Sequence, residues 1–238
     1  MIGLILIAIS WGLLRVQGRS LSVLGFNRPA QRLIELIAGF VLASLFASAQ
    51  FLLISKFSEF EWLPNPDFRA AMAFDSLRWI INSVLYEELI FRGYLLYKAM
   101  ELIGTRKACF LSAIAFGAYH WFSNEVFGSL VPMVYVFLLT SSFGFMLACS
   151  FSMTKSLVLP VALHLGWNTV TILVFSNGPL GSQMFLPSTT DTVLMSTSQQ
   201  IFTSFAVPLG LVILVLWVVT HRVHRDWQLT QCHSGTDA

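Results

Sequence analysis

Charged residues are scarce in this 238-residue sequence: they make up 11% of it, whereas apolar residues make up 56%. A soluble domain is usually about a quarter charged and less than half apolar. An apolar excess of this size cannot be buried in one water-soluble core, and the mean hydropathy of +0.73 agrees with that. Much of the chain therefore faces lipid, and we predict an integral membrane protein whose surroundings are the lipid bilayer.

Other features that are missing exclude further classes. The net charge of +2 comes without a basic arm or an aromatic–basic platform, which argues against a nucleic-acid partner. The three cysteines, Cys109, Cys149 and Cys232, show no spacing typical of a metal or redox site. No internal repeat or low-complexity segment divides the chain, so we predict a single integral membrane domain over residues 1–238.

Long apolar runs define the predicted fold class. We expect an all-α, polytopic transmembrane helical bundle of about seven spans, because such runs of about 17–25 residues alternate with polar segments. The first run is short, and the count becomes six if that run does not cross the membrane. The predicted spans are roughly 1–14, 33–54, 77–97, 108–127, 130–150, 157–176 and 200–220.

The positions of lysine and arginine predict the orientation. If the seven spans alternate, ten of the 14 basic residues fall on one side and only two, Lys56 and Arg69, fall on the other. Basic residues are enriched in cytoplasmic segments, so we expect a cytoplasmic C-terminal tail. This bias suits a bacterial inner membrane, although an endoplasmic or thylakoid membrane is also compatible with it.

Charged and strongly polar groups inside the spans are few and concentrated. A charged side chain at the middle of a bilayer costs at least ~2.5–3.5 kcal/mol, so its presence there indicates a function. The groups fall on three spans within a core of about 77–176. They are Glu87, Glu88 and Arg92 on the third span, His120 on the fourth, and His164 and Asn168 on the sixth.

The spacing of these residues predicts which of them pair. Glu88 and Arg92 are four residues apart and share a helix face, so they should form an ion pair. Glu87 is rotated by about 100° from Glu88 and remains available for other work. His164 and Asn168 are again four apart, and Gly166 between them leaves room for a neighbouring helix.

A carboxylate and two imidazoles in a partly dry cavity are suited to hydrolysis. A carboxylate beside a neutral histidine can take a proton from water, while a second histidine and an asparagine amide can donate hydrogen bonds to a developing oxyanion. These groups would make a peptidase without a serine or cysteine nucleophile. The same Glu/His/His set could instead hold zinc, although the H-E-x-x-H helix of many zinc proteases is absent.

The sequence resembles a known family, the CAAX protease and bacteriocin-processing enzyme family, also called the Abi family. Three motifs occur in the family's order and on separate predicted spans. They are Glu87-Glu88-x-x-x-Arg92, Phe116-x-x-x-His120 and His164-x-x-x-Asn168. The resemblance implies an all-helical intramembrane bundle with a cavity open toward the membrane and the cytosol.

The resemblance also implies a role for each matching residue. Glu87 would be the catalytic base and would act with His120 on the attacking water. His164 and Asn168 would form the oxyanion site. The remaining positions would support the site: Glu88, Arg92 and Phe116.

The sequence thus predicts an intramembrane endopeptidase acting on a membrane-associated peptide or a lipidated protein. No cofactor is favoured, because only Glu87, His120 and His164 are plausible zinc ligands and one of them is needed as the base. One alternative is a non-catalytic membrane scaffold or bacteriocin-immunity protein. Another is a proton-coupled transporter with Glu87 and His120 as a relay, but the internal duplication and broken helices typical of transporters are not visible.

Overall fold

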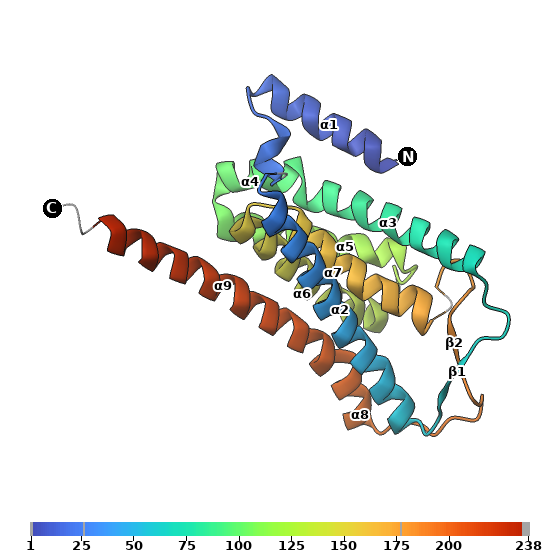
Figure 1. The fold of residues 1–238 in the computed structure, drawn as a ribbon. Helices are drawn as coiled ribbons and strands as arrows, with labels where there is room; N and C mark the ends of the chain where they lie inside the picture. The colour runs from blue at the N-terminus through green and yellow to red at the C-terminus, as the bar shows by residue number, and fades with distance from the viewer. Residues whose placement is uncertain (1, 26, 177, 235–238) are drawn as a thin grey trace.

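The structure of the protein, a computed structural model, describes residues 2–25, 27–176 and 178–234, with the backbone alone for Ile2, Leu4 and residues 222–234. This part of the chain is mostly helical, with one small two-stranded ribbon (Figure 1), which confirms the predicted helical class. The elements are α1 (Ile2–Val16), α2 (Pro29–Phe57), β1 (Trp62–Pro64), α3 (Ala70–Arg92), α4 (Tyr94–Ile103), α5 (Thr105–Ser123), α6 (Leu130–Thr154), α7 (Val158–Asn168), β2 (Phe185–Pro187), α8 (Thr197–Ile201) and α9 (Val207–Ser234).

Three helical stretches among the described residues are long and apolar enough to cross a membrane. They are Leu21–Phe57, Leu130–Thr154 and Thr197–His221. Two shorter apolar helices cover Ile5–Val16 and Val158–Val174. The chain is therefore an integral membrane protein, and the number of about seven spans stays a prediction. Successive long helices run alternately toward and away from the end where α9 finishes, as a multi-pass chain requires (Figure 1).

Small residues allow the central helices to pack closely. Helix α2 lies along α7, α5 lies along α6, and α1 lies along α3 (Figure 1). At the α2–α7 contact, a Cβ atom on Gly166 would lie 2.2 Å from the backbone oxygen of Phe40, and one on Gly39 would lie 3.0 Å from the Cβ of Ala162. Glycine at these positions lets the two helices approach, and so helps to place the residues on α7.

The expected third span, 77–97, differs from the structure at both ends. Helix α3 begins at Ala70 and ends at Arg92, and the chain turns at Gly93 before α4 starts. A Cβ atom at Gly93 would lie 2.2 Å from the backbone oxygen of Leu89, so only glycine allows this turn. Because of the turn, α4 is a separate helix with an exposed ion pair of 2.9 Å between Lys98 and Glu101.

Two segments between the predicted spans, 56–75 and 177–200, meet in the β-ribbon. Strands β1 and β2 are antiparallel, with Trp62 opposite Pro187. The Trp62 ring lies 4.9 Å from the ring of Phe175 and 5.0 Å from that of Phe60. The ribbon and its aromatic cluster thus tie together the end of α2, the start of α3 and the segment that follows α7.

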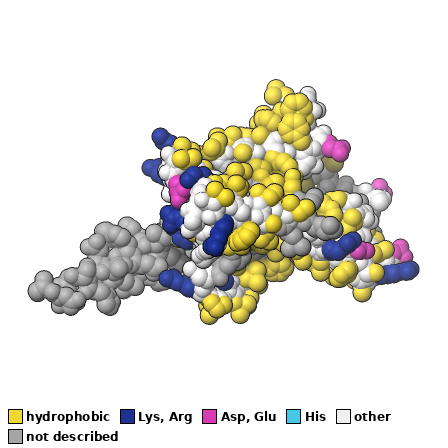
Figure 2. Space-filling view, turned by 90° about the horizontal axis from the view of Figure 1, so that it is seen from above, with side chains coloured by type: hydrophobic (Ala, Val, Ile, Leu, Met, Phe, Trp, Pro, Cys, Tyr) yellow, Lys and Arg dark blue, Asp and Glu magenta, His cyan; other side chains and the backbone are white. Residues whose placement is uncertain are grey.

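The described charges divide between the two ends of the bundle. Figure 2 shows lysine and arginine gathered at the end of the bundle toward which α9 runs. Basic and acidic side chains are mixed at the opposite end, and a broad hydrophobic band lies between the two ends. This separation agrees with the expected asymmetry of basic residues. Arg222 and Arg225, which the sequence placed in the cytoplasmic tail, have side chains outside the described part of the structure.

The close contact of α2 with α7 gives a test of the packing. We expect Gly166→Ala to lower the stability of the purified protein by about 1–3 kcal/mol, because the new methyl group must push the two helices apart. Gly12→Ala is the matched control, since nothing lies within 4 Å of its added Cβ. Thermal unfolding in detergent measures both, and equal melting temperatures for the two variants would contradict the α2–α7 contact.

Candidate active site

Three helices bring the predicted acid and imidazoles together inside the bundle. The Oε2 atom of Glu87 on α3 lies 3.9 Å from Nε2 of His120 on α5 and 3.8 Å from Nε2 of His164 on α7. The side chains are 9%, 15% and 9% exposed in that order, so the cluster is largely shielded. The three groups that the sequence singled out on separate spans therefore share one site.

Both imidazole rings are held through their other nitrogen. Nδ1 of His120 lies 2.8 Å from the backbone oxygen of Phe116, and Nδ1 of His164 lies 2.8 Å from Oε1 of Glu88. A carbonyl oxygen only accepts hydrogen bonds, so Nδ1 of His120 must carry the hydrogen. In the neutral ring Nε2 of His120 is then an acceptor, and it faces the carboxylate of Glu87.

Glu87 has hydrogen-bonding capacity left within the site. Its Oε1 accepts a long hydrogen bond of 3.4 Å from the hydroxyl of Ser83. Its Oε2 is buried and has no hydrogen-bond partner among the described residues. Buried polar atoms are rarely left unpaired, and Oε2 of Glu88 and Nε of Arg92 are also without a partner among the described residues. A separation of 3.8–3.9 Å to each Nε2 is too long for a direct hydrogen bond and is one that a shared water can bridge.

Arg92 forms the support behind this cluster. Its side chain is fully buried, and Nη1 lies 3.0 Å from Oε1 of Glu88, which confirms the pair predicted from their spacing. Nη2 donates a hydrogen bond of 3.3 Å to the backbone oxygen of Gly144 on α6, and the guanidinium carbon lies 4.1 Å from the centre of the Phe116 ring. One side chain therefore connects α3, α5 and α6 directly behind the cluster.

The sequence did not predict the link from Glu88 to His164. The same Oε1 atom accepts from both Arg92 and His164, so one carboxylate orients an imidazole while it neutralises a guanidinium. The contact joins residues 76 positions apart, and no local spacing rule covers such a pair. Gly144 was also missed: a Cβ there would lie 3.0 Å from Cδ1 of Phe116, which shows how tightly α6 packs behind that ring.

Phe116 packs against both histidines, in keeping with its expected supporting position. Its ring centre lies 4.4 Å from that of His120 and 6.0 Å from that of His164, the latter edge-on. Asn168 is the last residue of α7, one turn beyond His164, and its side chain is partly exposed. A π-helical turn, Thr169–Val174, follows it directly. Such turns are frequent at functional sites.

Whether the Glu87 cluster could hold zinc depends on the types of its donor atoms and on the distances between them. Among the described residues, no three His, Cys, Asp or Glu side chains lie close enough together to hold a metal ion. Zinc binds nitrogen and oxygen ligands at about 2.0–2.2 Å in tetrahedral geometry, so two ligands of one ion lie roughly 3.4 Å apart. The separations of 3.8 and 3.9 Å are longer than that. Each histidine also has its far nitrogen held by a carboxylate or carbonyl, as zinc-binding histidines do. The donor types and the held rings suit zinc, and the three groups would have to move closer together to bind it.

The fold and the site define a class of protein: a helical membrane protein with a buried glutamate and two oriented histidines. Residues 69–170 match the family described as type II CAAX prenyl endopeptidase Rce1-like. The match covers a little under half of the chain, from the start of α3 to just past Asn168. This match confirms the resemblance drawn from the three motifs, all of which lie within the matched residues. No curated protein and no solved structure matches the chain.

The buried pair gives a stability test. We expect Glu88→Leu to cost about 3–5 kcal/mol, because it leaves the guanidinium of Arg92 buried without its carboxylate. The double variant Glu88→Leu/Arg92→Met should recover much of this loss, since no uncompensated charge remains. Glu101→Leu is the control, because its pair with Lys98 is about one-third exposed and contributes little. Unfolding in detergent compares them, and a double variant no more stable than the single one would contradict the role given to the pair.

Proposed function

We propose that the protein is an intramembrane endopeptidase that hydrolyses an amide bond of a membrane-associated peptide or lipidated protein. The observation that carries the proposal is the position of the Glu87 carboxylate, within 3.9 Å of two imidazole nitrogens whose rings are held from behind. The Rce1-like match supports the same class, because that family is described as one of endopeptidases.

In the proposed reaction, Glu87 and His120 activate a water molecule. The water lies between Oε2 of Glu87 and Nε2 of His120, where the separation of 3.9 Å leaves room for one bridging molecule. Glu87 removes a proton as the water oxygen attacks the scissile carbonyl carbon, and a tetrahedral intermediate forms. The same carboxyl group then returns the proton to the leaving amine as the carbon–nitrogen bond breaks. Carboxylate and water are the only reacting groups needed from the site.

His164 and Asn168 would stabilise the oxyanion of that intermediate. Nδ1 of His164 is directed at Glu88, so the ring must carry hydrogens on both nitrogens for Nε2 to donate to the oxyanion. The resulting positive charge is favoured by Glu88 at 2.8 Å and by Glu87 at 3.8 Å. The Asn168 amide, one turn further along α7, would supply the second hydrogen bond. Glu88 and Arg92 thus position the site without touching the substrate.

The proposal favours catalysis without a metal, because Glu87 is one of only three candidate ligands and is required as the base. If zinc binds, the ligands are Glu87, His120 and His164, and the ion supplies a polarised water or carbonyl oxygen. The positioning of His164 by Glu88 and of His120 by Phe116 is the same with or without the ion.

The first test is cleavage by the purified full-length protein in lipid vesicles. The substrates are matched membrane peptides with and without a prenylated C-terminal cysteine motif. We expect Glu87→Gln, His120→Ala and His164→Ala each to lower the cleavage rate by roughly 10²–10⁴-fold, since each removes a group that takes part in proton transfer or charge stabilisation. Glu125→Gln, which changes an exposed acid near the end of α5, should leave the rate unchanged.

Retained cleavage in Glu87→Gln would refute its role as the base. Absence of cleavage by the wild type on every peptide, with the protein folded, would favour a binding scaffold instead. Metal content is measured in the same preparations. Stoichiometric zinc in the wild type that is lost in His120→Ala would overturn the metal-free mechanism.

The proposed orientation has a separate test. We propose that the C-terminal tail is cytoplasmic, because the basic residues gather at the end from which α9 leaves (Figure 2). A membrane-impermeant maleimide added outside intact cells should therefore fail to label Cys232 and should label Ser188→Cys, which lies just after β2 at the opposite end. Cys109 and Cys149 are buried, so they give little background. Labelling of Cys232 from outside would reverse the assignment.

A further inference from the structure

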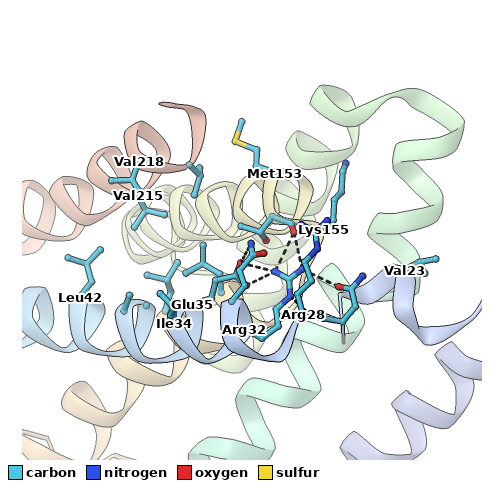
Figure 3. A pocket seen from close by; sticks show the side chains of 18 of the residues that line it. Val23, Arg28, Arg32, Ile34, Glu35, Leu42, Met153, Lys155, Val215 and Val218 are labelled. Carbon is cyan, nitrogen blue, oxygen red and sulfur yellow. Dashed lines mark hydrogen bonds and ion pairs between the residues drawn. The ribbon is translucent and has the colours of Figure 1, made fainter. Parts of the chain in front are cut away.

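A cavity lies away from the Glu87 cluster. It encloses about 580 Å³ between α2, the end of α6, α7 and α9, and none of the seven candidate site residues lines it (Figure 3). Small-molecule sites typically enclose about 300–1,000 Å³, so the cavity is large enough to hold a ligand. We refer to it as the α2–α9 slot.

The polar end of the slot is built around Arg32. Its Nη1 atom lies 2.7 Å from both carboxylate oxygens of Glu35, which is buried. Its Nε atom donates to the backbone oxygen of Asn27 at 3.1 Å, and Nη1 reaches the backbone oxygen of Thr154 at 3.5 Å. These bonds fix the start of α2 against the end of α6 (Figure 3). The charge of Arg32 is already paired with that of Glu35.

Two further cations line the same end. Arg28 and Lys155 are exposed, and within the described part of the chain neither has a carboxylate at ion-pair distance. Both also have positive φ angles, 56° and 53°, in the left-handed region that residues other than glycine rarely adopt. Lys155 adopts this conformation as the C-terminal cap of α6, and Arg28 adopts it at the start of α2. The polar end of the slot thus carries two positive charges that the described protein groups do not neutralise.

The other end of the slot is apolar. Leu42 on α2, Leu163 on α7 and Val215 on α9 line it, and Figure 3 shows Leu42 and Val215 on the side away from Arg28 and Lys155. From Arg28 to Leu42 the helix rises about 21 Å at 1.5 Å per residue. That length is enough for a headgroup and an acyl chain, since one leaflet contributes about 15 Å of hydrocarbon.

We propose that the α2–α9 slot binds one anionic phospholipid from the leaflet at the basic end of the bundle. The phosphate is held by Arg28 and Lys155, and an acyl chain lies along the apolar wall. A zwitterionic lipid would bring its own cation close to Arg28 and Lys155 together with its phosphate, whereas an anionic headgroup supplies the net negative charge that basic pockets between membrane helices favour. The slot is reachable from the bilayer, because Ile34 on its rim is 61% exposed. This binding does not depend on the proposed peptidase activity.

The test uses native mass spectrometry of the full-length protein in a neutral detergent, titrated with phosphatidylglycerol or phosphatidylcholine. We expect the wild type to retain one phosphatidylglycerol more tightly than phosphatidylcholine. Arg28→Gln/Lys155→Gln should weaken that binding roughly tenfold or more, because it removes both headgroup contacts. Arg106→Gln/Lys107→Gln is the matched control, with the same change in charge at exposed positions at the start of α5, and should bind as the wild type does.

Two more variants test whether the lipid occupies the slot itself. Ala38→Phe places a ring in the slot from an exposed helix position and should block lipid retention while the melting temperature without lipid is unchanged. Glu87→Gln should retain the lipid fully. Equal weakening by the two double variants, equal affinity for both lipids, or full retention by Ala38→Phe would overturn the proposal. Displacement of phosphatidylglycerol by inorganic phosphate alone would assign the cations to a soluble anion instead.

Discussion

The fully buried pair of Glu88 and Arg92 is the interaction on which the arrangement of the site depends. Removing two charges from water costs several kcal/mol per ion, and their mutual attraction offsets this only when the geometry is good and other hydrogen bonds are made. Here those bonds lead outward to His164 and to the backbone of α6, while the guanidinium lies on the ring of Phe116. The bonds of the pair therefore require α3, α5, α6 and α7 to take their places around it, and three of these helices carry the proposed reacting groups.

This arrangement separates orientation from chemistry between two adjacent glutamates. Glu88 points toward Arg92 and His164 through Oε1 and is completely buried, whereas Glu87 is rotated by about 100° along α3 and its Oε2 lies near both imidazoles. Two neighbouring acids on a helix cannot face the same direction, so in the proposed mechanism one sequence position supplies the support and the next supplies the base. A hydrolytic site in lipid needs both, because there is little water to orient or neutralise its groups.

Local spacing explains how much of this could be predicted from the sequence. The Glu88–Arg92 pair follows from a separation of four residues, and the gathering of Glu87, His120 and His164 follows from the cost of charge in lipid. The bond from Glu88 to His164 could not be predicted, since it depends on how α3 and α7 pack. The same holds for the ribbon, whose three-residue strands contain prolines and lack an alternating pattern, and for the slot, whose basic end is assembled from two distant turns.

Helix α7 connects the two sites physically. His164 faces the glutamates of α3, while the preceding residue, Leu163, lines the slot on the α2 and α9 side. Successive residues of a helix are about 100° apart, so a rigid rotation of α7 that moves one must move the other. Gly39 and Gly166 hold α7 tightly against α2, and therefore little rotation is possible without disturbing that contact. A lipid in the slot would add contacts on the α2 and α9 side of α7, where Leu163 lies.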